Sequence, residues 1–246
     1  MAYPYRRQLS FTFGGPLTPA VKYLIIANVV VFTLEILFPV LKVWLGLYPP
    51  AVLGGLQIWR LVTWLFIHGG IGHILFNMLF LFMFGCQLER LWGTRFFTHY
   101  YFVCGIGAGL FTFLPIPAFF YANHIGASGA IYGVLLAYGM TFPRNLIYVW
   151  LLFPIEARYF VLILGVIAFW GSMMGGGGVS HIAHLGGLAA GYLYLRLGSR
   201  RRSTRPIHVS SSSLRDAYRR WRVKRLRKKF EEYYQKRGGG THYDVH

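Results

Sequence analysis

Three separate groups of polar residues interrupt an otherwise apolar chain. His73 and Asn77 lie four residues apart in one apolar segment, Ser128 lies in a second, and His181 and His184 lie in a third. Each residue alone is compatible with simple packing, but a serine hydroxyl beside an imidazole can also perform nucleophilic hydrolysis. A metal site fits less well, because no HExxH pattern or acidic ligand accompanies the histidines. The pattern favours hydrolysis without a metal or a cofactor.

Other residues could supply the remaining parts of a hydrolytic site. His73 and Asn77, at positions i and i+4, project from one helix face and can both serve as oxyanion donors. The backbone N–H of Ser128, at a helix start preceded by Gly126, is a further unsatisfied donor. Tyr132 lies one turn further along the face of Ser128, where it can hold the catalytic histidine ring in place.

Acidic residues are too scarce to support other hydrolytic designs. The chain has seven, and its first Asp is Asp216, which excludes a protease with paired intramembrane aspartates. Of the three acids before Asp216, only Glu35 is expected on the side of the membrane where the polar groups lie. We therefore expect a dyad of Ser128 and His184 rather than a triad.

The composition is that of an integral membrane protein. Of the 246 residues, 55% are hydrophobic and 13% are charged, and the mean hydropathy is +0.46. Soluble domains typically have about 25% charged residues. The net charge of +18 is concentrated at the C-terminus, because 16 Lys and Arg and only four acids occur from Arg196 onward. Cys86 and Cys104 lie in apolar stretches, where we expect buried free thiols.

Six apolar segments are candidates to cross a bilayer, which takes about 20 residues for about 30 Å of hydrocarbon. They are residues 20–38, 71–91, 94–114, 128–142, 154–170 and 180–197. Proline and glycine interrupt residues 39–70, so we expect an interfacial loop without helices there. The expected fold class is an all-α bundle of six transmembrane helices.

Lysine and arginine are distributed unevenly between the two sides of this bundle. If the N-terminus is cytoplasmic, the outer segments carry only Lys42 and Arg60, which agrees with the positive-inside rule. Both termini are therefore expected in the cytoplasm. The expected domains are a cytoplasmic N-terminal segment (1–19), the membrane bundle (20–197) and a basic cytoplasmic tail (198–246).

The same topology brings the polar groups together. The second, fourth and sixth segments run in the same direction, and His73, Ser128 and His184 lie near their outer ends. Small residues four positions apart let membrane helices approach closely. Two such pairs occur, Gly129 with Gly133 beside the serine and Gly187 with Gly191 beside the histidine.

Three motifs resemble those of the rhomboid intramembrane serine proteases. Residues 68–78 (HGGIGHILFNM) resemble the helix with the HxxxN signature, residues 126–129 (GASG) the GxSG nucleophile motif, and residues 183–187 (AHLGG) the AHxGG motif. Residues 59–60 (WR) and 85–93 are also similar to family patterns. The resemblance covers about residues 59–191 and implies the basic six-helix form.

The resemblance implies a role for each matching residue. Ser128 would be the nucleophile and His184 the general base and acid, selected over His181, which lines a water cavity or only packs. The oxyanion hole would consist of His73, Asn77 and the Ser128 amide. The supporting residues would be Tyr132, Gly126, Gly129 and Gly187.

The resemblance also implies a substrate class. The family cleaves membrane-spanning segments of other proteins, so single-pass membrane proteins are the expected substrates, at the plasma or inner membrane of the cell. The fifth helix and the glycine run 175–178 would form a gate and cap, although a flexible loop is the alternative.

The sequence leaves alternatives to the protease function to be considered. A rhomboid-like binding protein without activity is one alternative, although the dyad is retained. A channel or transporter would need charges in mid-span and inverted repeats, and the sequence has neither.

Beyond Ser210–Ser213, a basic aromatic helix is expected to lie on anionic lipid, with disorder as the alternative. No nucleic-acid motif is present, so nucleic acid is not an expected partner.

Overall fold

The computed structural model describes residues 15–149, 152–174, 180–202, 221–222 and 225–226. The chain divides into two units, residues 1–198 and residues 199–246. In the second unit, the described residues comprise the end of one helix and two short helical pieces, where the guanidinium of Arg225 lies 5.2 Å from the ring centroid of Trp221. The glycine run 175–178, most of segment 1–19 and most of the tail lie outside the described residues.

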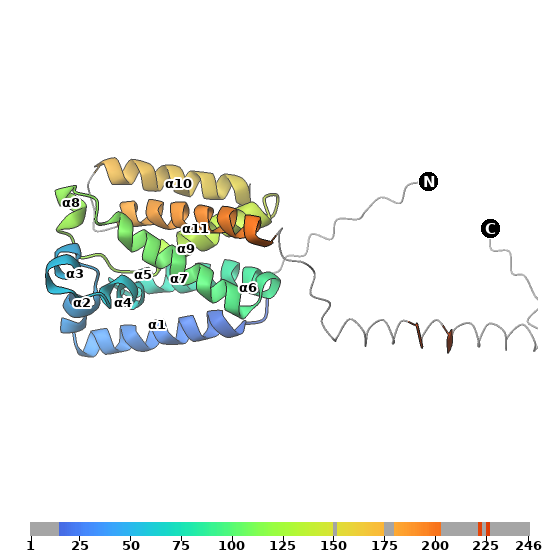
Figure 1. Ribbon diagram of the computed structural model, residues 1–246, viewed down its shortest axis with the longest axis horizontal. Helices are drawn as coiled ribbons and strands as arrows, with labels where there is room; N and C mark the ends of the chain where they lie inside the picture. Colours follow the sequence, from blue (N-terminus) through green and yellow to red (C-terminus); the bar gives the residue numbers. More distant parts are fainter. Residues whose placement is uncertain (1–14, 150–151, 175–179, 203–220, 223–224, 227–246) are drawn as a thin grey trace, which may run out of the picture. The chain divides into compact units, whose positions relative to one another are not determined.

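Long helices occupy the positions of all six predicted apolar segments (Figure 1). Three of these helical stretches, Pro19–Leu37, Ile71–Trp92 and Ala157–Met174, are long and apolar enough to cross a membrane. The helices are α1 (Pro19–Leu37), a continuous run of α5 (Ile71–Phe80), π-helical η2 (Leu81–Gly85) and α6 (Cys86–Trp92), then α7 (Thr94–Phe111), α9 (Ser128–Thr141), α10 (Ala157–Met174) and α11 (His181–Arg202).

The prediction of a helix-free loop at residues 39–70 is wrong. The segment forms α2 (Val40–Leu45), α3 (Pro49–Gly55), α4 (Arg60–Thr63) and the 3-10 turn η1 (Trp64–Phe66). Pro49 and Pro50 begin α3 instead of breaking it, because the first turn of a helix does not need their missing N–H groups. A further short helix, α8 (Pro117–Phe120), starts with proline in the same way.

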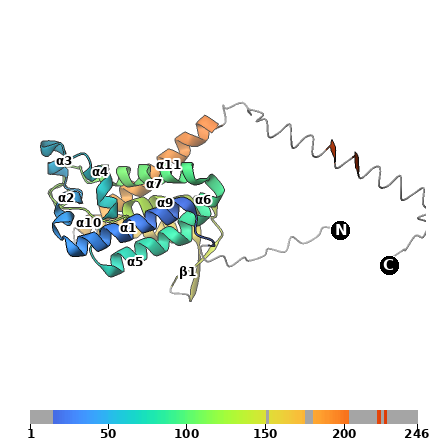
Figure 2. The ribbon, with the colours of Figure 1, turned by 90° about the horizontal axis from the view of Figure 1, so that it is seen from below.

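A short hairpin also departs from the all-α expectation. Strand β1 (Leu146–Val149) pairs antiparallel with β2 (Phe153–Glu156), and α10 begins only at Ala157 (Figure 2). The predicted start of this segment, at residue 154, is therefore too early. β-branched and aromatic side chains favour strands, and both strands contain them. The backbone N–H of Ala157 then donates to the carbonyl of Asn145, which joins the hairpin to the start of α10.

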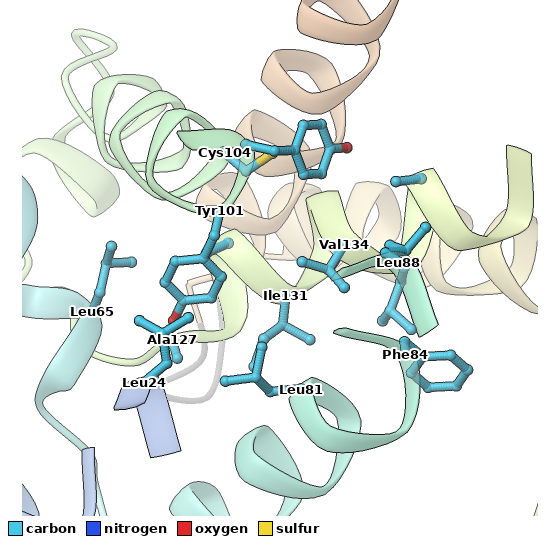
Figure 3. Close-up of a cluster of buried hydrophobic side chains, with 14 of the residues drawn as sticks. Leu24, Leu65, Leu81, Phe84, Leu88, Tyr101, Cys104, Ala127, Ile131 and Val134 are labelled. Atoms are coloured by element: carbon cyan, nitrogen blue, oxygen red, sulfur yellow. The ribbon is translucent and has the colours of Figure 1, made fainter. Parts of the chain in front are cut away.

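The hydrophobic core surrounds α9. Figure 3 shows Ile131 and Val134 of this helix in one cluster with Leu81 and Leu88 of the α5–η2–α6 run and Tyr101 of α7, and all five are buried. The two cysteines, Cys86 and Cys104, are buried free thiols, as predicted. This packing fixes α9, whose first residue is Ser128, in the middle of the bundle.

Glycines let the helices around α9 approach closely. A Cβ atom on Gly187 of α11 would overlap the carbonyl oxygen of Gly129, and a Cβ on Gly133 would overlap the side chain of Cys104 in α7. The small-residue pairs thus lie where the helices touch, as their spacing predicts.

Glu89, an acid buried at one end of the α5–η2–α6 run, has a structural explanation. Its carboxylate accepts hydrogen bonds from the Thr18 hydroxyl (2.5 Å), the backbone N–H groups of Ala20 (2.8 Å) and Val21 (3.0 Å), and the Thr94 hydroxyl (2.7 Å). These donors compensate for the cost of burying the charge. The single carboxylate thereby holds the starts of α1 and α7 together.

Candidate active site

Ser128 and His184 are in direct contact although 56 residues separate them. The hydroxyl oxygen of Ser128 lies 2.7 Å from Nε2 of His184. Ser128 is the first residue of α9, and His184 lies in the first turn of α11 and is only 6% exposed. Because the glycines hold the two helices close, a short serine side chain can reach the imidazole ring. A serine hydroxyl and an imidazole nitrogen at this distance have the arrangement that a nucleophile and its base require.

The backbone before Ser128 is set by Gly126. This residue has a φ of +116°, which L-residues with a side chain rarely adopt. Its N–H donates to the carbonyl of Trp64 (2.9 Å), which anchors the turn to η1. A Cβ atom here would lie 2.8 Å from Nε2 of His73 and 3.7 Å from the Ser128 hydroxyl. The glycine therefore lets the His73 ring lie close to the serine.

The hydrogen bonds of His73 identify its tautomer. Its Nδ1 accepts from the backbone N–H of Gly69 (3.2 Å). A neutral imidazole that accepts at one nitrogen carries its proton on the other, so Nε2 of His73 is a donor. Because Nε2 lies against Gly126, this N–H is available near the Ser128 hydroxyl. The Ser128 backbone N–H lies in the first turn of α9 and has no acceptor within its helix. The two groups can together bind an oxyanion.

Asn77 contacts the backbone of its own helix. Its side-chain nitrogen donates to the carbonyl of His73 one turn earlier in α5 (2.8 Å). The residue is buried on its own helix, and this bond stabilises the turn that carries His73. Its assignment to the oxyanion hole stays a prediction.

Aromatic packing holds the ring of His184. The ring of Tyr132, one turn after Ser128 in α9, stacks on the imidazole with centroids 4.1 Å apart and planes 6° from parallel. His181 makes an edge contact with His184 at 5.9 Å and lies against Gly171 of α10. Within the described residues, Nδ1 of His184 is buried and has no hydrogen-bond partner. Among the described residues, no carboxylate contacts this ring nitrogen.

Glu35, the acid expected on this side, belongs to a neighbouring network. Its carboxylate pairs with Lys42 (3.0 Å) and accepts from the backbone N–H of His68 (3.0 Å). The ring of His68 in turn contacts that of His73 edge-on at 5.1 Å. Burial lowers the pKa of His68 to about 4, with a smaller contribution from repulsion by His73. A neutral ring therefore supports His73.

The role of His68 was missed in the sequence, although it stands in the same glycine-rich run as His73. His68 lies before α5, which begins at Ile71. Helical periodicity therefore does not predict that its ring lies beside His73. The signal available in the sequence was a second histidine five residues before His73, which was already a candidate oxyanion donor.

Arg60 connects the start of α4 to the backbone of residues 43–46 by hydrogen bonds. The guanidinium of this buried residue donates to the Gln57 side chain (2.6 Å) and to the carbonyls of Val43 (2.7 Å) and Gly46. Burial also lowers the pKa of Arg60. The next connection is the pairing of Leu47 with His124, two residues before Gly126. Residues 43–64 are thus linked to the turn that presents Ser128.

Among the described residues, no group of three or more His, Cys, Asp and Glu side chains lies close enough to hold a metal ion.

Comparison with known proteins agrees with these observations. The family model of the rhomboid domain matches residues 55–201, which include Gly126, Ser128 and His184. The chain belongs to the rhomboid family. The matched range begins in α3 and ends within α11, so it contains the helices that carry His73, Ser128 and His184.

Several curated relatives of this rhomboid carry the word protease in their names. It is 35% identical over 141 residues to the rhomboid protease GluP of Bacillus subtilis, a match that covers 54% of this chain and 25% of GluP. Over 165 residues it is 30% identical to the rhomboid-like protease 1 of Toxoplasma gondii, which covers 65% of this chain and 53% of the relative. With the family protein YdcA of Bacillus subtilis it shares 34% identity over 137 residues, 55% of this chain and 64% of YdcA. The chain therefore spans less than two thirds of the length of these relatives.

Proposed function

We propose that this rhomboid is an intramembrane serine endopeptidase that hydrolyses peptide bonds in or near transmembrane segments of other membrane proteins. The observation that carries the proposal is the 2.7 Å contact between the Ser128 hydroxyl and Nε2 of His184. Membership of a family that contains named proteases supports the same conclusion. The proposed substrates are single-pass membrane proteins.

The chemistry follows from the protonation states of the two histidines. His184 is neutral and accepts the Ser128 proton at Nε2 while the serine oxygen attacks the peptide carbonyl. The negative charge that develops on the carbonyl oxygen of the substrate is bound by the Ser128 N–H and by Nε2–H of His73. His184 then delivers its proton to the leaving amine, and a water molecule repeats the sequence to release the acyl group. Tyr132 holds the imidazole in the plane that both transfers need.

The topology of the proposal is six transmembrane helices with both termini in the cytoplasm. The long helices α1, α5 to α6, α7, α9, α10 and α11 are the six spans, and the uneven distribution of Lys and Arg supports the orientation. Helix α9 has 14 residues, which rise about 21 Å at about 1.5 Å each and fall short of a hydrocarbon core of about 30 Å. Ser128 at its outer end then lies below the membrane surface.

The proposal also covers the domains of the chain and its place in the cell. Residues 20–197 form the membrane domain, with the cytoplasmic segment 1–19 before it and the basic tail 198–246 after it. The tail binds anionic lipid, and the protein resides in the plasma or inner membrane. No nucleic acid or metal takes part.

Cleavage of a single-pass membrane substrate in liposomes tests the activity. The wild-type chain should cleave the substrate, and the Ser128→Ala variant should not. A serine-reactive fluorophosphonate probe should label the wild type and leave Ser128→Ala unlabelled. Equal cleavage by both proteins would overturn the assignment of the nucleophile.

The alternative function is recognition of membrane segments without cleavage. It would gain support if the folded wild type bound a transmembrane segment but neither cleaved it nor reacted with the probe. The contact between Ser128 and His184 favours the protease, because a binding protein has no need of a serine hydroxyl aimed at an imidazole.

A further inference from the structure

Glu35 is a buried carboxylate that the proposed mechanism does not use. It lies near the end of α1 and is only 2% exposed. Burying a carboxylate is costly unless other groups pair with it and donate hydrogen bonds to it. An apolar residue would avoid this cost, so the partners of Glu35 bear on its role.

The carboxylate of Glu35 joins three segments of the chain. Oε1 lies 3.0 Å from Nζ of Lys42 in α2, a helix beside the end of α1 (Figure 1). Oε2 accepts a hydrogen bond from the backbone N–H of His68 (3.0 Å), which lies between η1 and α5. The side chain of Lys42 is 39% exposed, so water solvates the ammonium group while the carboxylate stays buried. The ion pair offsets a negative charge that would oppose an oxyanion formed nearby.

The hydrogen bond to His68 leads directly to His73. Gly69 follows His68, and its backbone N–H donates to Nδ1 of His73 (3.2 Å). Because peptide units are planar, only the two backbone dihedral angles of His68 separate these two N–H groups. An anchor on the first N–H therefore restricts the direction of the second.

This anchor matters because two glycines follow His68. Glycine leaves the backbone free to adopt many conformations. A Cβ atom at Gly69 would be in ordinary contact with Nδ1 of His73 at 3.5 Å, and among the described residues nothing lies within 4 Å of a Cβ at Gly70. Side-chain packing does little to hold these two residues, so hydrogen bonds must hold their backbone.

We propose that Glu35 is a positioning residue for the oxyanion donor His73. By accepting from the His68 N–H, its carboxylate fixes the peptide unit that follows. The Gly69 N–H then keeps the His73 ring oriented and its proton on Nε2. This role rests on the proteolytic function proposed above, whereas the state of the His73 ring can be measured without it.

Three substitutions of Glu35 separate a role as acceptor from a role as charge. Glu35→Gln keeps an oxygen acceptor on a side chain of the same length, and it should keep nearly the wild-type kcat. Glu35→Asp keeps the charge on a shorter side chain, and it should lower kcat about fivefold because the peptide is no longer held in the same place. Glu35→Leu has no acceptor and should lower kcat about thirtyfold, a part of the loss expected for a whole oxyanion donor. KM should change little, because the donor acts in the transition state.

Nitrogen NMR of protein with isotope-labelled histidine gives a readout that is independent of cleavage. At about pH 8 histidine side chains are neutral, and protonated and unprotonated ring nitrogens have distinct chemical shifts. The signals of His73 are those lost in His73→Gln. In the wild type and Glu35→Gln, Nε2 of His73 should carry the proton. In Glu35→Leu, the two nitrogen shifts of His73 should move towards each other as the ring exchanges between tautomers.

Asn28→Ala is the matched control in the same helix. Asn28 is fully buried, and its side-chain nitrogen donates to the carbonyl of Leu24 one turn earlier (2.8 Å). The substitution also removes a buried polar side chain from α1, but it should leave kcat and the His73 signals unchanged. Melting temperatures measured in detergent verify that each variant is folded.

Several outcomes would overturn the role of Glu35. These are a wild-type kcat in folded Glu35→Leu, a loss of kcat with unchanged His73 signals, and an equal loss in Asn28→Ala. If Glu35→Leu does not fold, a lower kcat in Glu35→Gln than in Glu35→Asp would overturn it, because charge would then matter more than the acceptor. An inactive wild type whose His73 signals still shift in Glu35→Leu would instead support the positioning role and overturn the proteolytic function.

Discussion

The phenol ring of Tyr132 lies flat on the imidazole of His184, with centroids 4.1 Å apart and planes 6° from parallel. The ring, rather than the hydroxyl group, makes this contact. Tyr132→Phe should therefore keep nearly wild-type activity. Tyr132→Ala should lower kcat about tenfold, with little change in KM, because a poorly oriented base slows only the chemical step. Cleavage kinetics in liposomes measure both constants, and an equal loss in the two variants would assign the role to the hydroxyl.

The two histidines of α11 should differ sharply in their importance. His184→Ala should lower cleavage by about a thousandfold or more, because the serine then has no base. His181→Ala should keep most of the activity, because its ring contacts His184 only at 5.9 Å and accepts no proton from Ser128. Fluorophosphonate labelling of Ser128 should follow the same order. An inactive, folded His181→Ala variant beside an active His184→Ala variant would reverse the assignment.

The turn before Ser128 should tolerate no side chain at Gly126. In Gly126→Ala the new methyl group would meet the His73 ring at 2.8 Å, and the φ of +116° would be strained. Displacing the His73 donor should lower kcat about a hundredfold, as the loss of one oxyanion donor does elsewhere.

Gly72→Ala is the matched control for that substitution. Nothing lies within 4 Å of a Cβ at Gly72, so the folded variant should keep its activity. Cleavage assays on both proteins, with melting temperatures measured in detergent, distinguish a local effect from unfolding. Equal activity of the two variants would contradict the role given to the His73 ring.

Acid should destabilise the protein in part through His68. Burial lowers the pKa of His68 to about 4, below its ordinary value of 6.5. The unfolded chain therefore binds more protons between these two values, and the stability from the neutral ring is lost as the pH falls from 6.5 towards 4. The loss at about pH 5 is about 1 to 2 kcal/mol.

His68→Gln tests this account because glutamine does not titrate. Its melting temperature should fall less between about pH 7 and pH 5 than that of the wild type, whereas His99→Gln, at an exposed position, should behave like the wild type. An unchanged pH dependence in His68→Gln would show that another group controls the response to acid.

Much of the fold follows from local patterns in the chain. The long helices occupy the predicted apolar segments, because a stretch of hydrophobic residues satisfies its backbone groups in lipid only as a helix. The hairpin at Leu146–Glu156 and the short helix at Pro49–Gly55 were missed. Pro154 was taken as the start of a helix but lies in a strand, whereas Pro49 and Pro50 were taken as helix breakers but begin a helix.

The candidate residues themselves could also be found in the sequence. Ser128, His184, His73 and Tyr132 are recognised by residue type and motif. Composition left three acids before Asp216, and the expected topology placed only Glu35 on the side of the polar groups. These are properties of the chain that do not depend on how it packs.

Only the tertiary structure decided how those residues are used. The 2.7 Å contact across 56 residues depends on close packing at Gly129 and Gly187, and the proton on Nε2 of His73 depends on the Gly69 N–H. Glu35 forms an ion pair with Lys42, and the position of Glu35 in the sequence does not indicate this partner. Residue types and helical periodicity are encoded locally, whereas distances between helices and the partners of buried polar groups arise only when the whole bundle packs.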